Sequence, residues 1–94
     1  MDGLMANNIK VYVEVTAEFK EDGTIIPCKI LWEDGREYTI DKVVDIRQAA
    51  ARKAGGQGDR YTVMINGSVS YLFFERNASM TGNNIGRFFV ERKA

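Results

Sequence analysis

The chain contains no histidine, a single cysteine and a single proline among its 94 residues. Without histidine, Ser-His-Asp and Cys-His catalysis are excluded, and so are most zinc sites. One cysteine cannot form an intramolecular disulfide, and no histidine is present to activate Cys28 as a nucleophile. We therefore expect a protein that is not an enzyme and that holds no cofactor and no metal ion.

Long apolar runs are also missing, which predicts neither a membrane span nor a signal peptide and suggests a cytoplasmic protein. The net charge is zero, so no overall charge attracts the chain to nucleic acid or to a membrane. The charges are unevenly distributed, however. Residues 1–46 hold ten acidic and five basic side chains, and residues 47–94 hold three acidic and eight basic ones. Strands of the two halves could interleave these charges, or the molecule could have an acidic and a basic face that favour a partner or self-association.

Apolar and polar residues alternate strictly from Ile9 to Lys20, which is typical of a strand with one buried face. The alternation continues on both sides of the turn signal at residues 33–35. A three-residue loop there, with Gly35 in a left-handed conformation, would place Ile30 opposite Tyr38 and keep apolar residues together.

A second hairpin is predicted around Asn66-Gly67. Built in the same way as the first, it would place Tyr61 opposite Tyr71 and carry the odd-numbered apolar residues on one face. A last short strand is expected over residues 85–92.

Between the hairpins, residues 47–54 are rich in alanine and arginine and are the one stretch that favours a helix. Asp45 could cap one or two helical turns and Gly55 could end them, with an extended crossing as the alternative. We expect an all-β fold: a small six-stranded antiparallel barrel or bent sheet of SH3-like size, with one short helical turn near 47–54. Residues 9–94 would form this single domain after a flexible N-terminus at 1–8.

The segment from Arg47 to Arg60 is the best candidate for a binding surface, because it holds four basic side chains and one acid, Asp59. Basic groups beside exposed aromatic rings hold single-stranded nucleic acid in small barrels, although such a segment is also a common solvated turn. The glycines could bind an anion through their backbone or could simply permit a tight return of the chain. The candidate surface comprises Arg47, Arg52, Lys53, Gly55, Gly56, Gly58, Arg60 and Tyr61.

Four motifs are unusual: AGGQGDRYT at 54–62, WEDGR at 32–36, YLFFE at 71–75 and FVE at 89–91. With these motifs the chain resembles, over residues 9–92, a group of small uncharacterised β-rich proteins of Gram-positive anaerobic bacteria whose function is unassigned. The resemblance implies a stand-alone β domain and no particular mechanism. The chain departs from the group at Phe88-Phe89, where a tryptophan would be expected before the second phenylalanine.

Two functions remain. The leading hypothesis is a non-catalytic binding or interaction module that contacts a protein partner or forms a homodimer, because predicted hairpin edges are open and no catalytic set is present. The alternative is binding of single-stranded RNA or DNA through the basic 47–60 segment. We expect no membrane partner.

Overall fold

A computed structural model describes residues 8–51, 56–76 and 85–93, and these form a single sheet of antiparallel strands. The described residues contain no helix, so the expected all-β class is confirmed. The strand order in the sheet is β3-β2-β1-β7-β6-β5-β4. The strands are β1 (Asn8–Phe19), β2 (Ile25–Leu31), β3 (Glu37–Thr39), β4 (Lys42–Ala51), β5 (Gly56–Ile65), β6 (Ser68–Arg76) and β7 (Gly86–Lys93).

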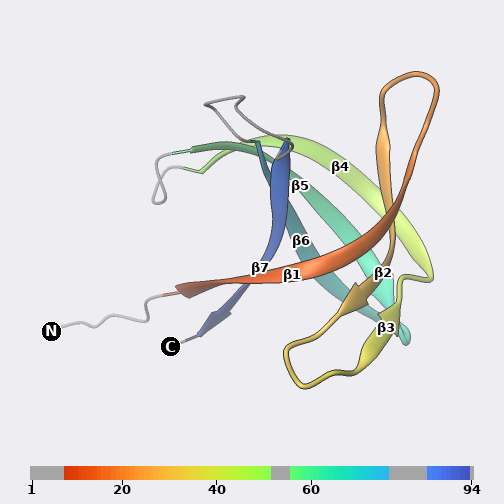
Figure 1. The fold of residues 1–94 in the computed structure, drawn as a ribbon, viewed down its shortest axis with the longest axis vertical. Coiled ribbons are helices and arrows are strands. Elements are labelled where there is room, and N and C mark those ends of the chain that lie inside the picture. Colours follow the sequence, from red (N-terminus) through yellow and green to blue (C-terminus); the bar gives the residue numbers. More distant parts are fainter. Residues whose placement is uncertain (1–7, 52–55, 77–84, 94) are drawn as a thin grey trace, which may run out of the picture.

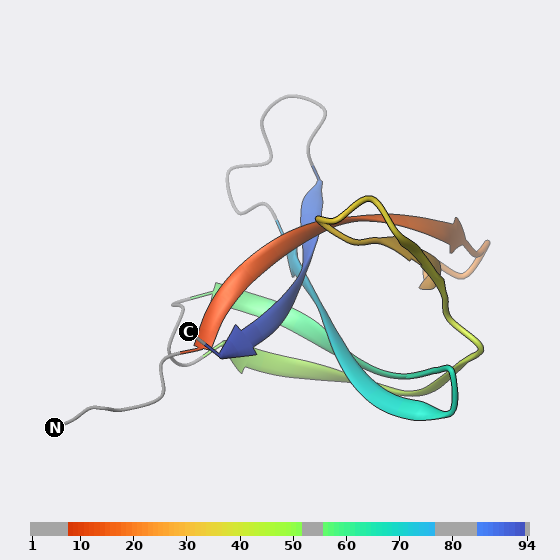
Figure 2. The ribbon, with the colours of Figure 1, turned by 90° about the horizontal axis from the view of Figure 1, so that it is seen from below.

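The sheet curls into a half-barrel, as the two views in Figures 1 and 2 show. Its two edge strands, β3 and β4, are consecutive in the sequence and are joined by Ile40 and Asp41 alone. The Ile40 amide donates to the Cys28 carbonyl of β2 at 2.9 Å, and the Asp41 amide donates to the Met64 carbonyl of β5 at 2.8 Å. This short link is therefore hydrogen-bonded to the strand next to each edge, β2 and β5, and it holds the two edges of the sheet together.

The core lies on the concave face of the curl. The alternation in β1 turns Val13 and Val15 toward it, where they pack on the buried residues of the opposite strands. Val63 and Leu72 are fully buried at its centre. The buried cluster consists of Ile30, Ile40, Tyr61, Val63, Leu72 and Phe74.

The first hairpin has the predicted register. Ile30 lies opposite Tyr38, and the loop places Gly35 at φ 88°. The Trp32 amide donates to the Arg36 carbonyl at 2.8 Å, which closes the three-residue loop. Keeping apolar residues on one face was therefore sufficient to identify this pairing.

The predicted register of the second hairpin is wrong. Asn66 and Gly67 alone form the turn, with φ values of 52° and 80°, because this tight turn matches the twist of the strands. Tyr61 therefore lies opposite Leu72 instead of Tyr71. The one-residue change buries Leu72 and leaves Tyr71 51% exposed on the outer face.

The helical turn expected near 47–54 is also wrong for the residues that the structure describes. Residues 47–51 belong to β4, which pairs with β5 as far as Ala51 and Gly56. The segment is too short for a stable isolated helix, and the ladder with β5 supplies backbone hydrogen bonds at every second residue. Residues 52–54 lie outside the described part of the chain.

The strand count and the N-terminal boundary need smaller corrections. The described residues form seven strands instead of the expected six, because the chain after the first hairpin loop forms two strands that are separated by Ile40 and Asp41. Asn8, which was assigned to the flexible N-terminus at 1–8, already belongs to β1. Residues 1–7 lie outside the described residues.

Candidate functional site

The predicted surface at 47–60 is only partly assembled by the fold. Arg47 and Arg60 lie directly opposite each other across β4 and β5, so they share the outer face of the sheet. Gly56 and Gly58 belong to β5, which corrects the expected loop through them. Arg52, Lys53 and Gly55 lie outside the described residues.

Tyr61 does not belong to an exposed binding surface. Its side chain is 3% exposed, and its hydroxyl donates to the Ile25 carbonyl at 2.8 Å, which ties β5 to the start of β2. Burial, with a smaller contribution from the Asp59 charge, raises the pKa of Tyr61. Tyr61 is thus a structural residue that cannot stack on a ligand.

The two described arginines of the segment have partners within the fold. The Arg47 Nε donates to Asp45 Oδ2 at 2.7 Å. The Arg60 guanidinium lies over the Tyr71 ring, 5.2 Å from its centroid. The exposed aromatic ring beside the basic pair is therefore Tyr71, on β6, and not Tyr61.

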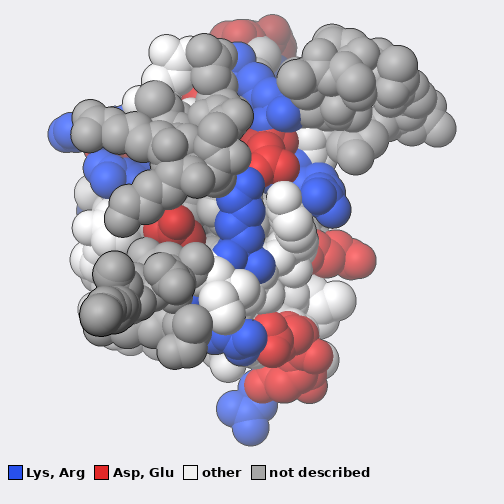
Figure 3. Space-filling view, turned by 90° about the vertical axis from the view of Figure 1, so that its left-hand side faces the viewer, with Lys and Arg blue, Asp and Glu red and all other residues white. Residues whose placement is uncertain are grey.

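Basic and acidic side chains alternate on the face of the molecule shown in Figure 3. Ion pairs join the acidic and basic halves of the sequence: Lys10 contacts Glu75, and Arg92 Nη1 lies 3.1 Å from Glu33 Oε1. The pairing of β1 with β7 brings the two halves side by side. These contacts support interleaved charges over separate acidic and basic faces.

The Glu75 carboxylate is the centre of a small polar cluster on the outer face. It accepts hydrogen bonds from the Lys10 amine and, at 3.0 Å, from the Tyr12 hydroxyl. The Arg87 guanidinium lies over the Tyr12 ring, 3.6 Å from the ring centroid. The hydrogen bond from Lys10, assisted by that from Tyr12, lowers the pKa of Glu75 despite partial burial. The cluster joins β1, β6 and β7 and holds Glu75 in its ionised form. Sequence alone did not reveal it, because Lys10 and Glu75 are 65 positions apart.

Replacing Glu75 with glutamine is expected to reduce the free energy of unfolding at pH 7 by about 1 kcal/mol, because the carboxylate is partly exposed. Because the pKa of Glu75 is lower in the folded protein than the ordinary glutamate pKa of 4.5, the carboxylate stabilises the fold at pH values above 4.5. This stabilisation is lost as the pH falls through the folded-state pKa. The difference between wild type and E75Q should therefore shrink below about pH 4.5 in urea titrations. The control is the same substitution at the exposed Glu14. If the difference between wild type and E75Q did not change with pH, the ionised Glu75 carboxylate would not be the source of the stabilisation.

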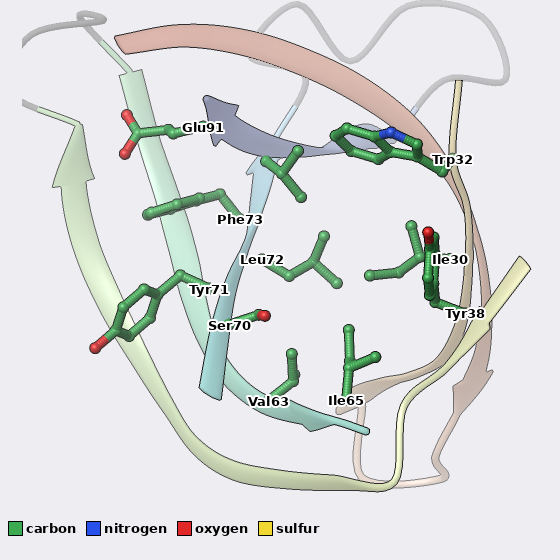
Figure 4. Close-up of a pocket in the computed structure, with 11 residues that line it drawn as sticks. Ile30, Trp32, Tyr38, Val63, Ile65, Ser70, Tyr71, Leu72, Phe73 and Glu91 are labelled. Carbon is green, nitrogen blue, oxygen red and sulfur yellow. The ribbon is translucent and has the colours of Figure 1, made fainter. Parts of the chain in front are cut away.

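A hollow of the concave face lies between β6 and β7, and we call it the β6–β7 crevice. It has a volume of about 580 Å³. Figure 4 shows Ile30, Trp32 and Tyr38 from the first hairpin approaching Leu72 of β6 across this space. Its lining residues are Ile30, Trp32, Tyr38, Val63, Ile65, Ser70, Tyr71, Leu72, Phe73, Val90 and Glu91.

The crevice exists because β6 and β7 separate. They pair only from Phe73 to Arg76 and from Gly86 to Phe89, after which β7 continues beside β1. Successive residues of a ladder direct their backbone groups to alternate sides, and the tight turn at the start of β6 sets this alternation. The backbone groups of Tyr71 on β6 and Glu91 on β7 therefore point toward the gap, where the described residues provide no strand partner.

The residues that line the crevice are suited to bind a ligand or a partner segment. A space of this size with a mainly apolar lining, which includes four aromatic residues, and few polar groups is typical of sites for small apolar ligands or for a few side chains of a partner. Ser70 and Glu91 are the polar residues of its lining besides the two tyrosines, and Figure 4 shows the Tyr71 hydroxyl pointing away from the space. The sequence placed Tyr38 with Ile30 on the apolar face of the first hairpin, but it did not predict an open crevice there.

Comparisons with known proteins give no further guide to the site. No family model, no curated protein and no solved structure matches the chain. The resemblance to the Gram-positive group stays a prediction.

Within the residues that the structure describes, no cluster of three or more metal-ligating side chains occurs. The same residues include no helix long and apolar enough to cross a membrane.

Proposed function

We propose that this protein is a non-catalytic interaction module that binds an extended segment of a partner protein in the β6–β7 crevice. One observation carries the proposal: an apolar crevice lies beside two strand edges that pair there with no other described strand. An added strand gains affinity from main-chain hydrogen bonds and specificity from pockets for alternate side chains. The crevice offers both.

The lining indicates what the partner segment contains. Trp32, Tyr38 and Leu72 favour apolar side chains at alternate positions of an extended peptide, because such side chains point to the same face. Glu91, at the rim, favours a lysine or arginine next to them. The cytoplasmic location suggested by the sequence stays part of this proposal.

The test uses Trp32, the single tryptophan of the chain, as a reporter in the crevice. Peptides selected from a displayed library of random linear sequences should change the Trp32 fluorescence on binding. Ser70→Leu places a larger side chain in the crevice without removing a core contact, and it should weaken peptide binding at least about tenfold. Ser68→Leu, on the exposed start of the same strand and outside the crevice lining, is the matched control and should leave binding unchanged.

Two results would contradict the proposal. Selected peptides that bind Ser70→Leu as tightly as wild type would place their site elsewhere. A library that yields only sequences without alternate apolar residues would show that the crevice does not read an extended segment. Circular dichroism and thermal unfolding of both serine variants establish that each one is folded.

Binding of single-stranded nucleic acid stays the alternative, and it would use Tyr71 together with Arg47 and Arg60. The support is the Arg60 guanidinium over an exposed tyrosine, because arginine and aromatic rings together stack on bases. A labelled oligonucleotide that binds at low salt, and binds Ser70→Leu equally well, would favour this alternative over the crevice.

A further inference from the structure

A second feature that can bind another chain is the outer edge of β4. This strand has ten residues and ends the strand order of the sheet, and Figures 1 and 2 show it along the border of the curl. Arg47 pairs with Arg60 of β5, and the alternation along the ladder turns the backbone groups of Ile46 and Gln48 away from β5. A long edge with free backbone groups is a template for pairing with another strand.

The side chains on this edge are self-complementary. Asp45 and Arg47 flank Ile46 symmetrically and share the outer face of β4. If two copies of β4 pair antiparallel about a two-fold axis at Ile46, Asp45 of each copy lies opposite Arg47 of the other. Asp45 and Arg47 then form close, non-hydrogen-bonded pairs, whereas Ile46 lies opposite itself as a hydrogen-bonded pair.

The neighbouring registers lack this complementarity. A two-fold axis at residue 45 places two aspartates opposite each other, and an axis at residue 47 does the same with two arginines. Like charges directly opposite each other across strands are destabilising. The charge pattern thus favours one register and disfavours the two adjacent ones.

Exposed apolar residues on the same strand add to the tendency to pair. Val44 is 52% exposed and Ile46 is 39% exposed. In the register centred on Ile46 the two isoleucines contact each other, and each Val44 lies opposite Gln48 of the second copy. Pairing would cover apolar surface that the monomer leaves in water.

We propose that the chain forms a two-fold symmetric homodimer by antiparallel pairing of its β4 strands, centred on Ile46. The dimer joins two half-barrels into one continuous sheet and leaves the β6–β7 crevice of each copy open. A single strand pair buries a small interface, so the dimer is weak and salt-sensitive. The inference does not depend on what binds in the crevice.

Charge exchange tests the register. In sedimentation equilibrium at low salt, Asp45→Arg and Arg47→Asp should each weaken dimerisation about tenfold, because each replaces two opposite-charge pairs with two like-charge pairs. The double variant D45R/R47D restores both pairs and should dimerise within about threefold of wild type. An equimolar mixture of the two single variants should form the heterodimer, in which every cross-strand pair is again opposite in charge.

A backbone variant provides a second measurement. Gln48→Pro removes an amide that points away from β5, so it should prevent pairing between copies without breaking the β4–β5 ladder. Thermal unfolding confirms that each variant is folded. A wild type that stays monomeric up to millimolar concentration, or single charge variants that dimerise as tightly as wild type, would overturn the proposal. Loss of dimerisation in both the single variants and the double variant would overturn the register.

Discussion

Replacing Leu72 with alanine is expected to lower the free energy of unfolding by about 3 kcal/mol. Leu72 is fully buried at the centre of the concave face, where it packs among Tyr61, Val63 and Phe74. Truncation removes the transfer free energy of the lost methyl groups and leaves a cavity that a curled sheet fills only in part. Urea denaturation followed by circular dichroism measures the change.

Val69, on the same strand, provides the control that identifies the register. It is 56% exposed, and Val69→Ala should change the free energy of unfolding by less than about 0.5 kcal/mol. In the alternative register with a three-residue loop, Val69 would lie opposite Val63 in the core and its truncation would be costly. A larger loss for Val69→Ala than for Leu72→Ala would therefore contradict the hairpin described above.

Replacing Gly58 with alanine is expected to destabilise the fold by about 2 kcal/mol or more, because a methyl group must be forced into a packed contact. A Cβ atom at this position would lie 2.5 Å from the Phe74 carbonyl oxygen of β6. Backbone cannot move aside as a flexible side chain can, so β5 and β6 would have to separate near the start of β5. The loss should appear as a lower midpoint in urea denaturation.

Gly23 is the matched control for this substitution. It lies in the turn between β1 and β2 at φ 92°, with no atom within 4 Å of an added Cβ. Gly23→Ala therefore tests the left-handed backbone alone, which costs about 1 kcal/mol. If Gly58→Ala proved less harmful than Gly23→Ala, close packing of β5 on β6 would not be the reason for the glycine.

The alternation of apolar residues predicted most of the sheet, and it failed where both faces of a strand are apolar. In the first hairpin the polar residues between the apolar ones left a single acceptable register. In β6, Leu72, Phe73 and Phe74 are consecutive, so the period of two does not identify the buried face. The geometry of the Asn66-Gly67 turn decides the register there, and it places Leu72 and Phe74 inside.

The candidate site could not be predicted from the sequence, for a different reason. The helix propensity of residues 47–51 is local, and the ladder with β5 overrides it. The β6–β7 crevice has no local signal, because residues from β2, β3, β5, β6 and β7 form it. Its existence depends on the point at which β7 leaves β6, and neither composition nor periodicity encodes that point.

The two-residue link between the edge strands limits the shape of the whole sheet. Laid flat, seven strands about 4.8 Å apart would put β3 and β4 about 29 Å from each other. Three Cα–Cα steps, from Thr39 to Lys42, span at most about 11 Å. The chain therefore cannot adopt a flat sheet with this strand order. The covalent connection at Ile40 and Asp41 therefore requires the curvature that creates the concave face and, with it, the crevice.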